Sequence, residues 1–391
     1  MTRTTQVNRR RFLEVGALGV GYGFVAPRAH GAQSTRDSAR TTGTVRMLGD
    51  GLGLTPAETA RVWTDLAANG DIVPDSYSNG GTVEQLETAV AKLLGKERAV
   101  FMPTGTLANH LAVRALASSG GRAVVQAESH LYNDSGDCVQ TLSNMPLIPL
   151  ATGRGSFTLE ELEGAFERTG GGRVATSIPV ISIETPIRRR FGETFDAREL
   201  GRIVAFAKRH DIRLHLDGAR IFLQSAYEGR TVAEYAAPFD TVYVSLYKYF
   251  NAPSGAVLAG SRAMLDKMYH TRRMFGAGLP AAWPFAAIAH HYLADFVNRF
   301  RQAIDTSEAW VQQIARHEAF TVTRIPNGTN LLHLKVASDT TRAETFRRRL
   351  RDVGITLGTP RADGSYLIGV NETWNRRSAD ELADLFVTSL G

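Results

Sequence analysis

Cysteine and lysine are scarce in this sequence, and both shortages limit the chemistry. Cys138 is the only cysteine among 391 residues, which excludes an intramolecular disulfide and a multi-cysteine zinc or iron–sulfur site. The adjacent His290 and His291 point to different sides of a helix, so we expect no metal site. Chemistry that needs a primary amine has six lysines to draw on: Lys92, Lys96, Lys208, Lys248, Lys267 and Lys335.

The sequence also has little net charge outside the N-terminus. The formal net charge is +6, but residues 1–32 carry five arginines against one acidic residue. No basic helix with base-stacking aromatic residues is found, so we expect no nucleic-acid partner. Apolar residues make up 43% and charged residues 21%, which is typical of a globular chain, and the length favours two domains.

The N-terminus resembles an export signal. Residues 8–14 read Asn-Arg-Arg-Arg-Phe-Leu-Glu, similar to a twin-arginine signal, and a Gly-rich apolar stretch follows from Val15 to Ala26. That stretch is shorter than the ~20 residues of a membrane-spanning helix. We predict a signal peptide over 1–32, a linker over 33–44, and a periplasmic or extracellular mature protein without a membrane span. A basic, disordered N-terminal arm is the alternative.

Apolar runs alternate with amphipathic helical segments from Arg46 to Gly260. Most of the runs are apolar at nearly every position, as in a sheet that is covered on both faces. Helices over Leu159–Arg168 and Asp196–His210 connect them, which predicts a mainly parallel α/β sheet. The seven predicted strands are Ala99–Met102, Arg122–Gln126, Pro146–Leu150, Val180–Glu184, Ile212–Asp217, Thr241–Leu246 and Gly255–Gly260.

The pattern changes after about Ala282. One long helix is predicted over Phe285–His317, followed by short strands and two further helices. We therefore predict a large domain over 45–282 and a small α+β domain over 283–391. Near the start of the large domain, Thr82-Val83-Glu84-Gln85 has the spacing of a capping box at the beginning of a helix.

Two polar residues follow neighbouring strands. Asp217 ends one strand and is followed by Gly218, Ala219 and Arg220, and Lys248 comes directly after the next strand. Ligands of open α/β sheets bind at the carboxyl ends of strands, where a carboxylate can face a cofactor nitrogen. Taken alone, Lys248 is better explained as a surface lysine in a loop. Together, Asp217 and Lys248 at the ends of two strands favour a ligand-binding site at that edge of the sheet.

These motifs carry a family resemblance. Leu-His-Leu-Asp-Gly-Ala-Arg at 214–220, Ser-Leu-Tyr-Lys at 245–248 with a following Ala-Pro-Ser-Gly, and Phe-Met-Pro-Thr-Gly-Thr-Leu-Ala-Asn at 101–109 resemble the threonine aldolase and aromatic amino acid β-eliminating lyase family. The resemblance implies fold type I of pyridoxal phosphate enzymes (aspartate aminotransferase-like), with a large seven-stranded sheet domain and a small C-terminal domain. It also implies pyridoxal 5'-phosphate as cofactor and a homodimer or homotetramer.

The resemblance assigns catalytic roles residue by residue. Lys248 would form the Schiff base with the cofactor, and Asp217 would pair with the pyridine nitrogen. His130 would stack on the cofactor ring and take the proton of a substrate hydroxyl, directly or through water. Arg220 would contact the phenolic oxygen of the cofactor, the substrate carboxylate, or both.

The resemblance also implies a phosphate site. Gly105 and Thr106 open a predicted helix, where backbone N–H groups and the helix dipole bind anions. Thr104 precedes them, and the Ser245 hydroxyl would add a contact to the phosphate. Simple N-capping by Thr104 or Thr106 is the structural alternative and fits the same geometry.

The sequence departs from the family where the substrate binds. Gly49 stands at the position of a carboxylate-binding serine, Tyr366 at that of an arginine of the small domain, and no second histidine follows Glu184. Among the three arginines at 188–190, one is a candidate to compensate for the lost arginine; a solvated basic loop is the alternative. Cofactor binding is therefore better supported than substrate recognition.

The leading functional hypothesis is a lyase that cleaves the Cα–Cβ bond of a β-hydroxy-α-amino acid, giving glycine and an aldehyde. A second hypothesis keeps the cofactor but eliminates a leaving group from Cβ, giving ammonia and a keto acid. Racemisation and transamination stay open, because they share the carbanion at Cα. A third hypothesis is an exported, non-catalytic binding protein on the same fold.

Overall fold

The computed structural model describes residues 43–117, 120–337 and 340–391. All of them belong to one compact unit of the chain. The predicted signal at 1–32 and nearly all of the predicted linker at 33–44 lie outside the described residues. Within the described ranges, no helix combines the length and the hydropathy that a membrane crossing requires.

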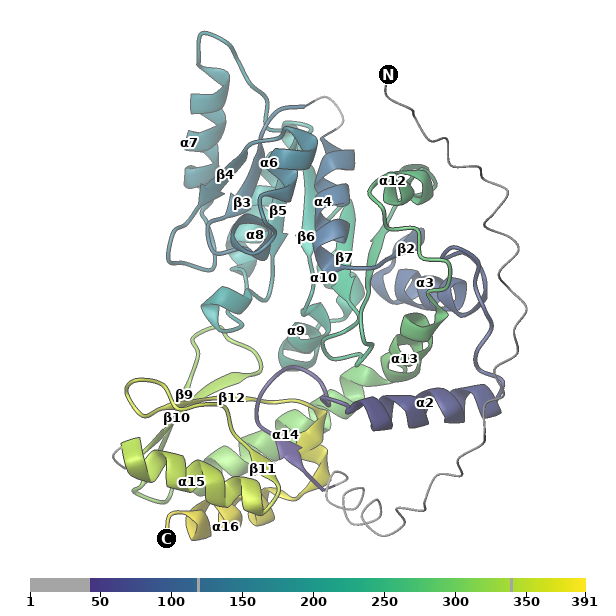
Figure 1. Cartoon of the computed structure of the whole chain (residues 1–391). Helices are drawn as coiled ribbons and strands as arrows, with labels where there is room; N and C mark the ends of the chain where they lie inside the picture. The colour runs from purple at the N-terminus through teal and green to yellow at the C-terminus, as the bar shows by residue number, and fades with distance from the viewer. Residues whose placement is uncertain (1–42, 118–119, 338–339) are drawn as a thin grey trace, which may run out of the picture. The chain divides into compact units, whose positions relative to one another are not determined.

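A seven-stranded sheet in the order β2–β8–β7–β6–β5–β3–β4 forms the centre of the fold (Figure 1). The pairs from β7 to β4 are parallel, whereas β8 is antiparallel to both β2 and β7. The predicted mainly parallel sheet is confirmed. The strands are β2 (Arg98–Met102), β3 (Ala123–Gln126), β4 (Leu147–Leu150), β5 (Val180–Glu184), β6 (Arg213–Asp217), β7 (Thr241–Ser245) and β8 (Ala256–Gly260).

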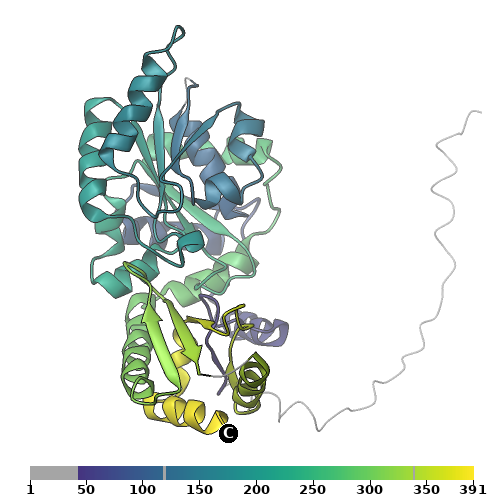
Figure 2. The same cartoon turned by 90° about the vertical axis from the view of Figure 1, so that its left-hand side faces the viewer.

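Helices cover both faces of this sheet (Figure 2). Successive side chains of β2 point to opposite faces of the sheet, and both sets are buried under helices. Ala99 and Phe101 pack into the core that includes α3 (Gly81–Leu94), whereas Val100 and Met102 pack with α4 (Gly105–Leu116). The remaining helices of this part are α2 (Pro56–Ala68), α5 (His130–Asn133), α6 (Cys138–Ser143), α7 (Leu159–Gly170), α8 (Ala197–Arg209), α9 (Ile221–Glu228), α10 (Val232–Ala236), α11 (Arg262–Leu265), α12 (Met268–Met274) and α13 (Trp283–Leu293).

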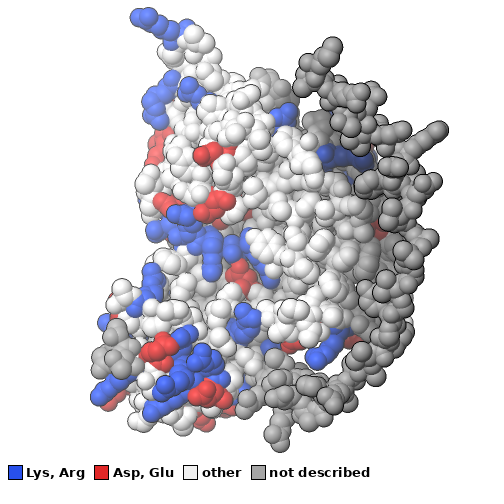
Figure 3. Space-filling view, in the orientation of Figure 1, with Lys and Arg blue, Asp and Glu red and all other residues white. Residues whose placement is uncertain are grey.

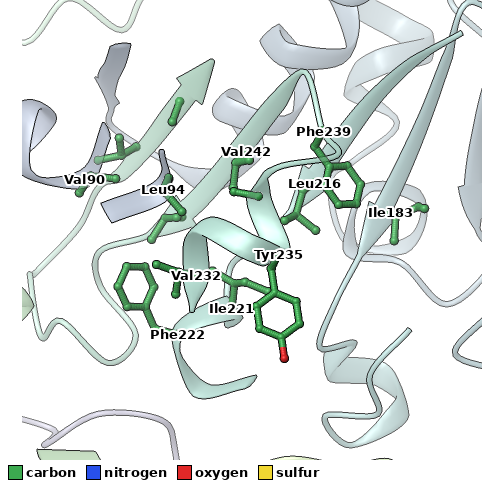
Figure 4. Packing of buried hydrophobic residues seen from close by; sticks show 14 of the residues in the cluster. Val90, Leu94, Ile183, Leu216, Ile221, Phe222, Val232, Tyr235, Phe239 and Val242 are labelled. Carbon is green, nitrogen blue, oxygen red and sulfur yellow. The ribbon is translucent and has the colours of Figure 1, made fainter. Parts of the chain in front are cut away.

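The largest core lies under β5, β6 and β7 and joins them to helices on one face. Figure 4 shows Leu216 and Val242 of the sheet close to Ile221, Phe222 and other apolar side chains of the surrounding helices. Burying such side chains contributes ~1.5–3 kcal/mol each to folding. This packing fixes the strand ends, and therefore the residues that follow them.

A second core lies around a three-stranded antiparallel sheet in the order β12–β10–β9. Val45 and Met47, at the start of the described chain, are fully buried in it, and β1 pairs with β11. Helix α14 contributes Phe300 to the first core and Trp310 to the second. The elements are β1 (Val45–Arg46), β9 (Phe320–Arg324), β10 (Leu331–Val336), β11 (Ile355–Thr356), β12 (Tyr366–Gly369), α14 (Phe296–Ile314), α15 (Thr340–Asp352) and α16 (Ala379–Ser389). The predicted domain boundary at 282/283 stays a prediction.

Two local predictions are wrong. The single helix expected over 285–317 is interrupted, because Asp295 adopts a left-handed conformation with φ 53° and the Arg299 side chain donates to carbonyls at the end of α13. The capping box at Thr82 is absent: helix α3 begins after Gly80, and the Thr82 hydroxyl instead accepts a hydrogen bond from the Val73 N–H at 2.8 Å.

Charged side chains of both signs gather on the left-hand part of the face shown in Figure 3. Their pairing is local. Elsewhere, on helix α8, Arg202 forms ion pairs with Glu199 of the same helix and with Glu160 of the neighbouring helix α7. Such exposed ion pairs contribute ~0–1 kcal/mol each, which is less than the burial of one large apolar side chain in the cores.

Candidate active site

A cavity of about 410 Å³ opens at the carboxyl-terminal edge of the parallel strands. Strands β5 and β6 end there in Glu184 and Asp217, which are neighbours across the ladder. Most of the residues predicted from the sequence converge on this cavity. Those that line it are Thr104, Gly105, Thr106, His130, Asp217, Arg220 and Lys248.

Ser245 is the exception among the predicted site residues. It ends strand β7, is fully buried, and is not among the described residues that line the cavity. Its hydroxyl has no hydrogen-bond partner in the described part of the chain. A contact between Ser245 and a phosphate therefore stays a prediction.

Lys248 follows β7 and lies between two cavities. It lines the first cavity and also a second one of about 720 Å³. Burial and the neighbouring Arg220 lower the pKa of Lys248 to about 8, although Asp217 and Asp50 favour the charged form. An amine with this pKa is partly neutral near physiological pH, and only the neutral amine attacks a carbonyl.

Asp217 is held by a buried chain of hydrogen bonds. Its Oδ2 accepts from Asn109 Nδ2 at 2.5 Å, and Asn109 Oδ1 lies 2.9 Å from His215 Nε2. On the other side of the ring, His215 Nδ1 lies 2.9 Å from the Thr241 hydroxyl. Burial lowers the pKa of His215 to about 4, so the ring is neutral and donates through Nε2 to Asn109. This chain fixes the orientation of the Asp217 carboxylate.

Arg220 is anchored by a carboxylate that comes from far away in the sequence. Its Nε donates to Asp50 Oδ2 at 2.9 Å, and Asn330 Nδ2 donates to Asp50 Oδ1 at 3.1 Å. Burial alone raises the pKa of Asp50, but Arg220, Arg188 and Asn330 outweigh it and the pKa is lowered. Asp50 is therefore ionised and holds Arg220 at the wall of the cavity.

The start of helix α4 forms another wall. Thr104 is the N-cap and accepts from the Leu107 N–H at 3.2 Å, so the N-capping alternative is realised. A Cβ on Gly105 would lie 2.0 Å from the Tyr243 hydroxyl, so only glycine fits there. The backbone thus approaches the cavity closely and presents the free N–H groups of a helix N-terminus, which is suited to an anion.

His130 begins the short helix α5 and is positioned by Glu184. The Glu184 Oε2 accepts from the His130 backbone N–H at 2.6 Å, and the imidazole Nδ1 lies 3.2 Å from the Ser135 hydroxyl. Burial and the nearby Asp217 raise the pKa of Glu184 to about 7. Glu184 was not singled out from the sequence as a site residue. Its place at the end of a buried strand, like that of Asp217, is the signal that could have identified it.

Tyr366 and Gly49, the two residues that replace a carboxylate-binding residue of the family, do not line the first cavity. Tyr366 is fully buried in the second core, where its hydroxyl donates to the Ala343 carbonyl at 2.5 Å, so it does not reach the cavity. Gly49 lines the second cavity next to Asp50. Of these two residues, only Gly49 lies near Arg220 and Lys248, which line the same second cavity.

Comparison with known proteins defines the class and then the family. The fold is that of pyridoxal phosphate enzymes of fold type I. It resembles a putative L-allo-threonine aldolase from Listeria monocytogenes (TM-score 0.73, 22% identity, 90% of this chain and 98% of the other). It also resembles a putative β-eliminating lyase/threonine aldolase from Exiguobacterium (TM-score 0.74, 24% identity, 90% and 98%). The beta-eliminating lyase family model matches residues 55–337, and the chain belongs to this family.

Relatives in this family carry more than one activity in their names. The chain is 26% identical to low-specificity L-threonine aldolase 1 of Arabidopsis thaliana, over 74% of this chain and 82% of that protein. It is 31% identical to the low-specificity L-threonine aldolase of Candida albicans, over 55% and 58%. An alanine racemase of Cochliobolus carbonum is 32% identical over 56% and 57%. The family is one of pyridoxal phosphate-dependent lyases, which confirms the predicted cofactor and enzyme class.

Proposed function

We propose that the protein cleaves the Cα–Cβ bond of a β-hydroxy-α-amino acid with pyridoxal phosphate as cofactor, giving glycine and an aldehyde. The observation that carries this proposal is the convergence of Lys248, Asp217, Arg220 and His130 on one cavity. Threonine aldolases among the relatives support the choice of reaction.

The residues present fit the cofactor. Lys248 offers an amine with a lowered pKa, Asp217 is a fixed carboxylate at a strand end, and the start of α4 offers backbone N–H groups to a phosphate. The buried, unpartnered Ser245 hydroxyl lies three residues before the lysine and is available as a further donor. These groups match an aldehyde, a basic ring nitrogen and a dianion.

When bound, pyridoxal phosphate withdraws the electron pair that is released at Cα. Asp217 would hold the ring nitrogen of the bound cofactor in its protonated form by accepting a hydrogen bond from it. His130 takes the proton of the β-hydroxyl as the Cα–Cβ bond breaks, so the hydroxyl carbon leaves as an aldehyde. The Lys248 amine lies at the same cavity and could return a proton to Cα. The same amine would then displace the product nitrogen from the cofactor, which releases glycine.

The test is to incubate the purified protein carrying the cofactor with L-threonine and L-allo-threonine, and to measure acetaldehyde and glycine. Equal amounts of both products support the proposal. The second candidate is β-elimination, which the description of the family model favours; ammonia and a keto acid in place of glycine would establish it. Turnover to the opposite enantiomer would indicate a racemase, and cofactor binding without any turnover would indicate a binding protein.

We further propose export by the twin-arginine route to the periplasm or the cell exterior. The motif at residues 8–14 and the following apolar stretch support this. Because that route carries folded proteins, it suits a protein that binds its cofactor before export. Fractionation of cells that express the wild type and an Arg9→Lys/Arg10→Lys/Arg11→Lys variant tests this, since the variant is expected to stay in the cytoplasm. A homodimer or homotetramer is proposed from the family resemblance and is tested by light scattering.

A further inference from the structure

Three consecutive arginines follow strand β5, and each has a carboxylate within 4.0 Å. The side chains of two of them are close enough to that carboxylate for a hydrogen bond. Arg189 Nη1 lies 3.1 Å from Asp134 Oδ1, and Arg190 Nε lies 3.1 Å from Glu193 Oε2. The arginine side chains in both pairs are partly exposed. Their charges are already compensated, so neither is the natural partner of a further anion.

Arg188 differs from its two neighbours. Its side chain is also partly exposed, at 41%, but the Nη1 atom is buried and has no hydrogen-bond partner among the described residues. The Asp50 Oδ1 is 4.0 Å away, beyond hydrogen-bond reach, and the Asp50 oxygens already accept from Arg220 and Asn330. Buried charged donors without acceptors are rare in native proteins. Arg188 Nη1 therefore has an unused hydrogen bond at the wall of the cavity, with only the more distant Asp50 carboxylate as an ion-pair partner.

The turn that carries Arg188 is fixed by the chain itself. The Arg188 N–H donates to Glu184 Oε1 at 3.2 Å, and the Phe191 N–H donates to the Arg188 carbonyl at 3.0 Å, which closes the short 3₁₀ helix η2 (Arg188–Arg190). The Glu184 carboxylate also accepts from the backbone of His130. Arg188 is thereby tied to the end of β5 and to the residue that faces the reacting part of the substrate.

The charges around Arg188 leave room for one more anion. Arg188, Arg220 and Lys248 all act on Asp50, the carboxylate that they share. Burial and the repulsion by Arg220 disfavour the charged form of Arg188, although Asp50 favours it, and its pKa is lowered. A carboxylate bound beside Arg188 would relieve that repulsion. A phosphate has its own site at the start of α4, in another wall of the cavity.

We propose that Arg188 binds the α-carboxylate of the amino-acid substrate, next to Arg220. This inference rests on the proposed function and adds a requirement to it: the substrate must carry a free carboxylate, and amines or amides of the same shape bind weakly. A guanidinium recognises a carboxylate through two parallel N–H···O bonds, which fixes the orientation of the bond that breaks at Cα. Arg188 thus takes the place of the arginine that the family has in its small domain.

The experiment measures equilibrium binding rather than turnover. The wild type, Arg188→Gln, Arg188→Lys and the control Arg190→Gln are loaded with cofactor and titrated with glycine and with glycinamide, by calorimetry and by the absorbance of the cofactor. Arg190 lies in the same turn but does not line the cavity. Cofactor occupancy and the melting temperature are recorded for each variant, so that a folding defect is separated from a binding defect.

Arg188→Gln is expected to weaken glycine binding by about tenfold or more, because a charge-assisted hydrogen bond is lost. Glycinamide binding is expected to stay unchanged, since glycinamide has no carboxylate. Arg188→Lys is expected to restore part of the difference, and Arg190→Gln to match the wild type. Unchanged glycine affinity in Arg188→Gln, an equal loss for both ligands, or a loss of cofactor instead would overturn the assignment. If the wild type binds glycine through Arg188 but cleaves no β-hydroxy-α-amino acid, the proposed reaction is contradicted and the assignment of Arg188 still holds.

Discussion

At the scale of single residues, the site depends on charges that are buried next to each other. Asp217 and Lys248 could be found from the sequence, because Asp217 ends one buried strand and Lys248 lies shortly after the end of the next, each within a recognisable motif. The strand end marks Glu184 as a candidate, but the contacts of Asp50, Asn109 and Glu184 could not be derived from the sequence alone. Their partners lie between 54 and 170 residues away in the chain, at Arg220, Asp217 and His130, and only the fold brings them together.

The lowered pKa of Lys248 predicts a pH dependence. Burial and Arg220 shift the pKa downwards to about 8, so the neutral amine appears as the pH rises through 8 rather than through the usual range above 10. The rate at which cofactor-free protein captures pyridoxal phosphate is expected to rise with pH around 8 and then level off. Stopped-flow absorbance between pH 6 and 10 measures it.

The variant Asp217→Asn tests the direction in which the pH profile of cofactor capture shifts. Asp217 raises the pKa of Lys248, so its removal is expected to move the midpoint of the capture profile to lower pH. Asp266→Asn, on the surface next to Arg98, serves as the control and is expected to leave the midpoint in place. A wild-type midpoint near 10 would contradict the account of Lys248.

His130→Asn is expected to lower kcat for cleavage by ~10²–10⁴-fold, because the residue that accepts the hydroxyl proton is lost. Bound cofactor is expected to remain, since Lys248 and Asp217 are untouched. His291→Asn, on the exposed side of α13, is the matched control with unchanged kcat. Steady-state kinetics with L-threonine and the absorbance of the bound cofactor give both readouts. A kcat that stays within about twofold in His130→Asn would reject the assigned base.

At the scale of elements, the strands could be predicted closely, and errors occurred where side chains override local patterns. Each predicted sheet strand is found with ends within a residue, because buried parallel strands leave continuous apolar runs. The pattern over 285–317 stays apolar and periodic through its break, which depends on the Arg299 side chain. The Thr82 hydroxyl accepts a hydrogen bond from the Val73 N–H instead of capping helix α3, and the spacing of residues within the helix cannot predict this contact.

The junction of β2 and α4 gives a prediction at this scale. In Gly105→Ala the added Cβ meets the Tyr243 hydroxyl, so we expect a loss of ~1–3 kcal/mol in the free energy of unfolding and weaker cofactor binding. Gly201→Ala in helix α8 is the opposite control: nothing lies near its Cβ, and we expect a gain of ~0.5–1 kcal/mol. Urea unfolding of both variants checks the pair. A neutral Gly105→Ala would mean that α4 can move away from β7.

At the scale of the whole molecule, every site residue predicted from the sequence lies within the described ranges, and the start of the described chain forms part of the second core. Deleting residues 1–42 is therefore expected to leave the melting temperature and the bound cofactor unchanged. Deleting residues 1–48 removes β1 with the fully buried Val45 and Met47, and costs several kcal/mol, since each large buried side chain lost costs ~2–5 kcal/mol. Equal stability of the two truncated proteins in thermal unfolding would show that β1 does not support the fold.

The central claim is that Lys248 binds pyridoxal phosphate in the cavity at the strand ends. The most direct measurement is the near-visible absorption spectrum of the purified protein with added cofactor, beside Lys248→Ala, before and after borohydride. The account predicts a band of lysine-bound cofactor that borohydride quenches in the wild type and that is missing in the variant. No such band in the wild type, or the same band in Lys248→Ala, would contradict it.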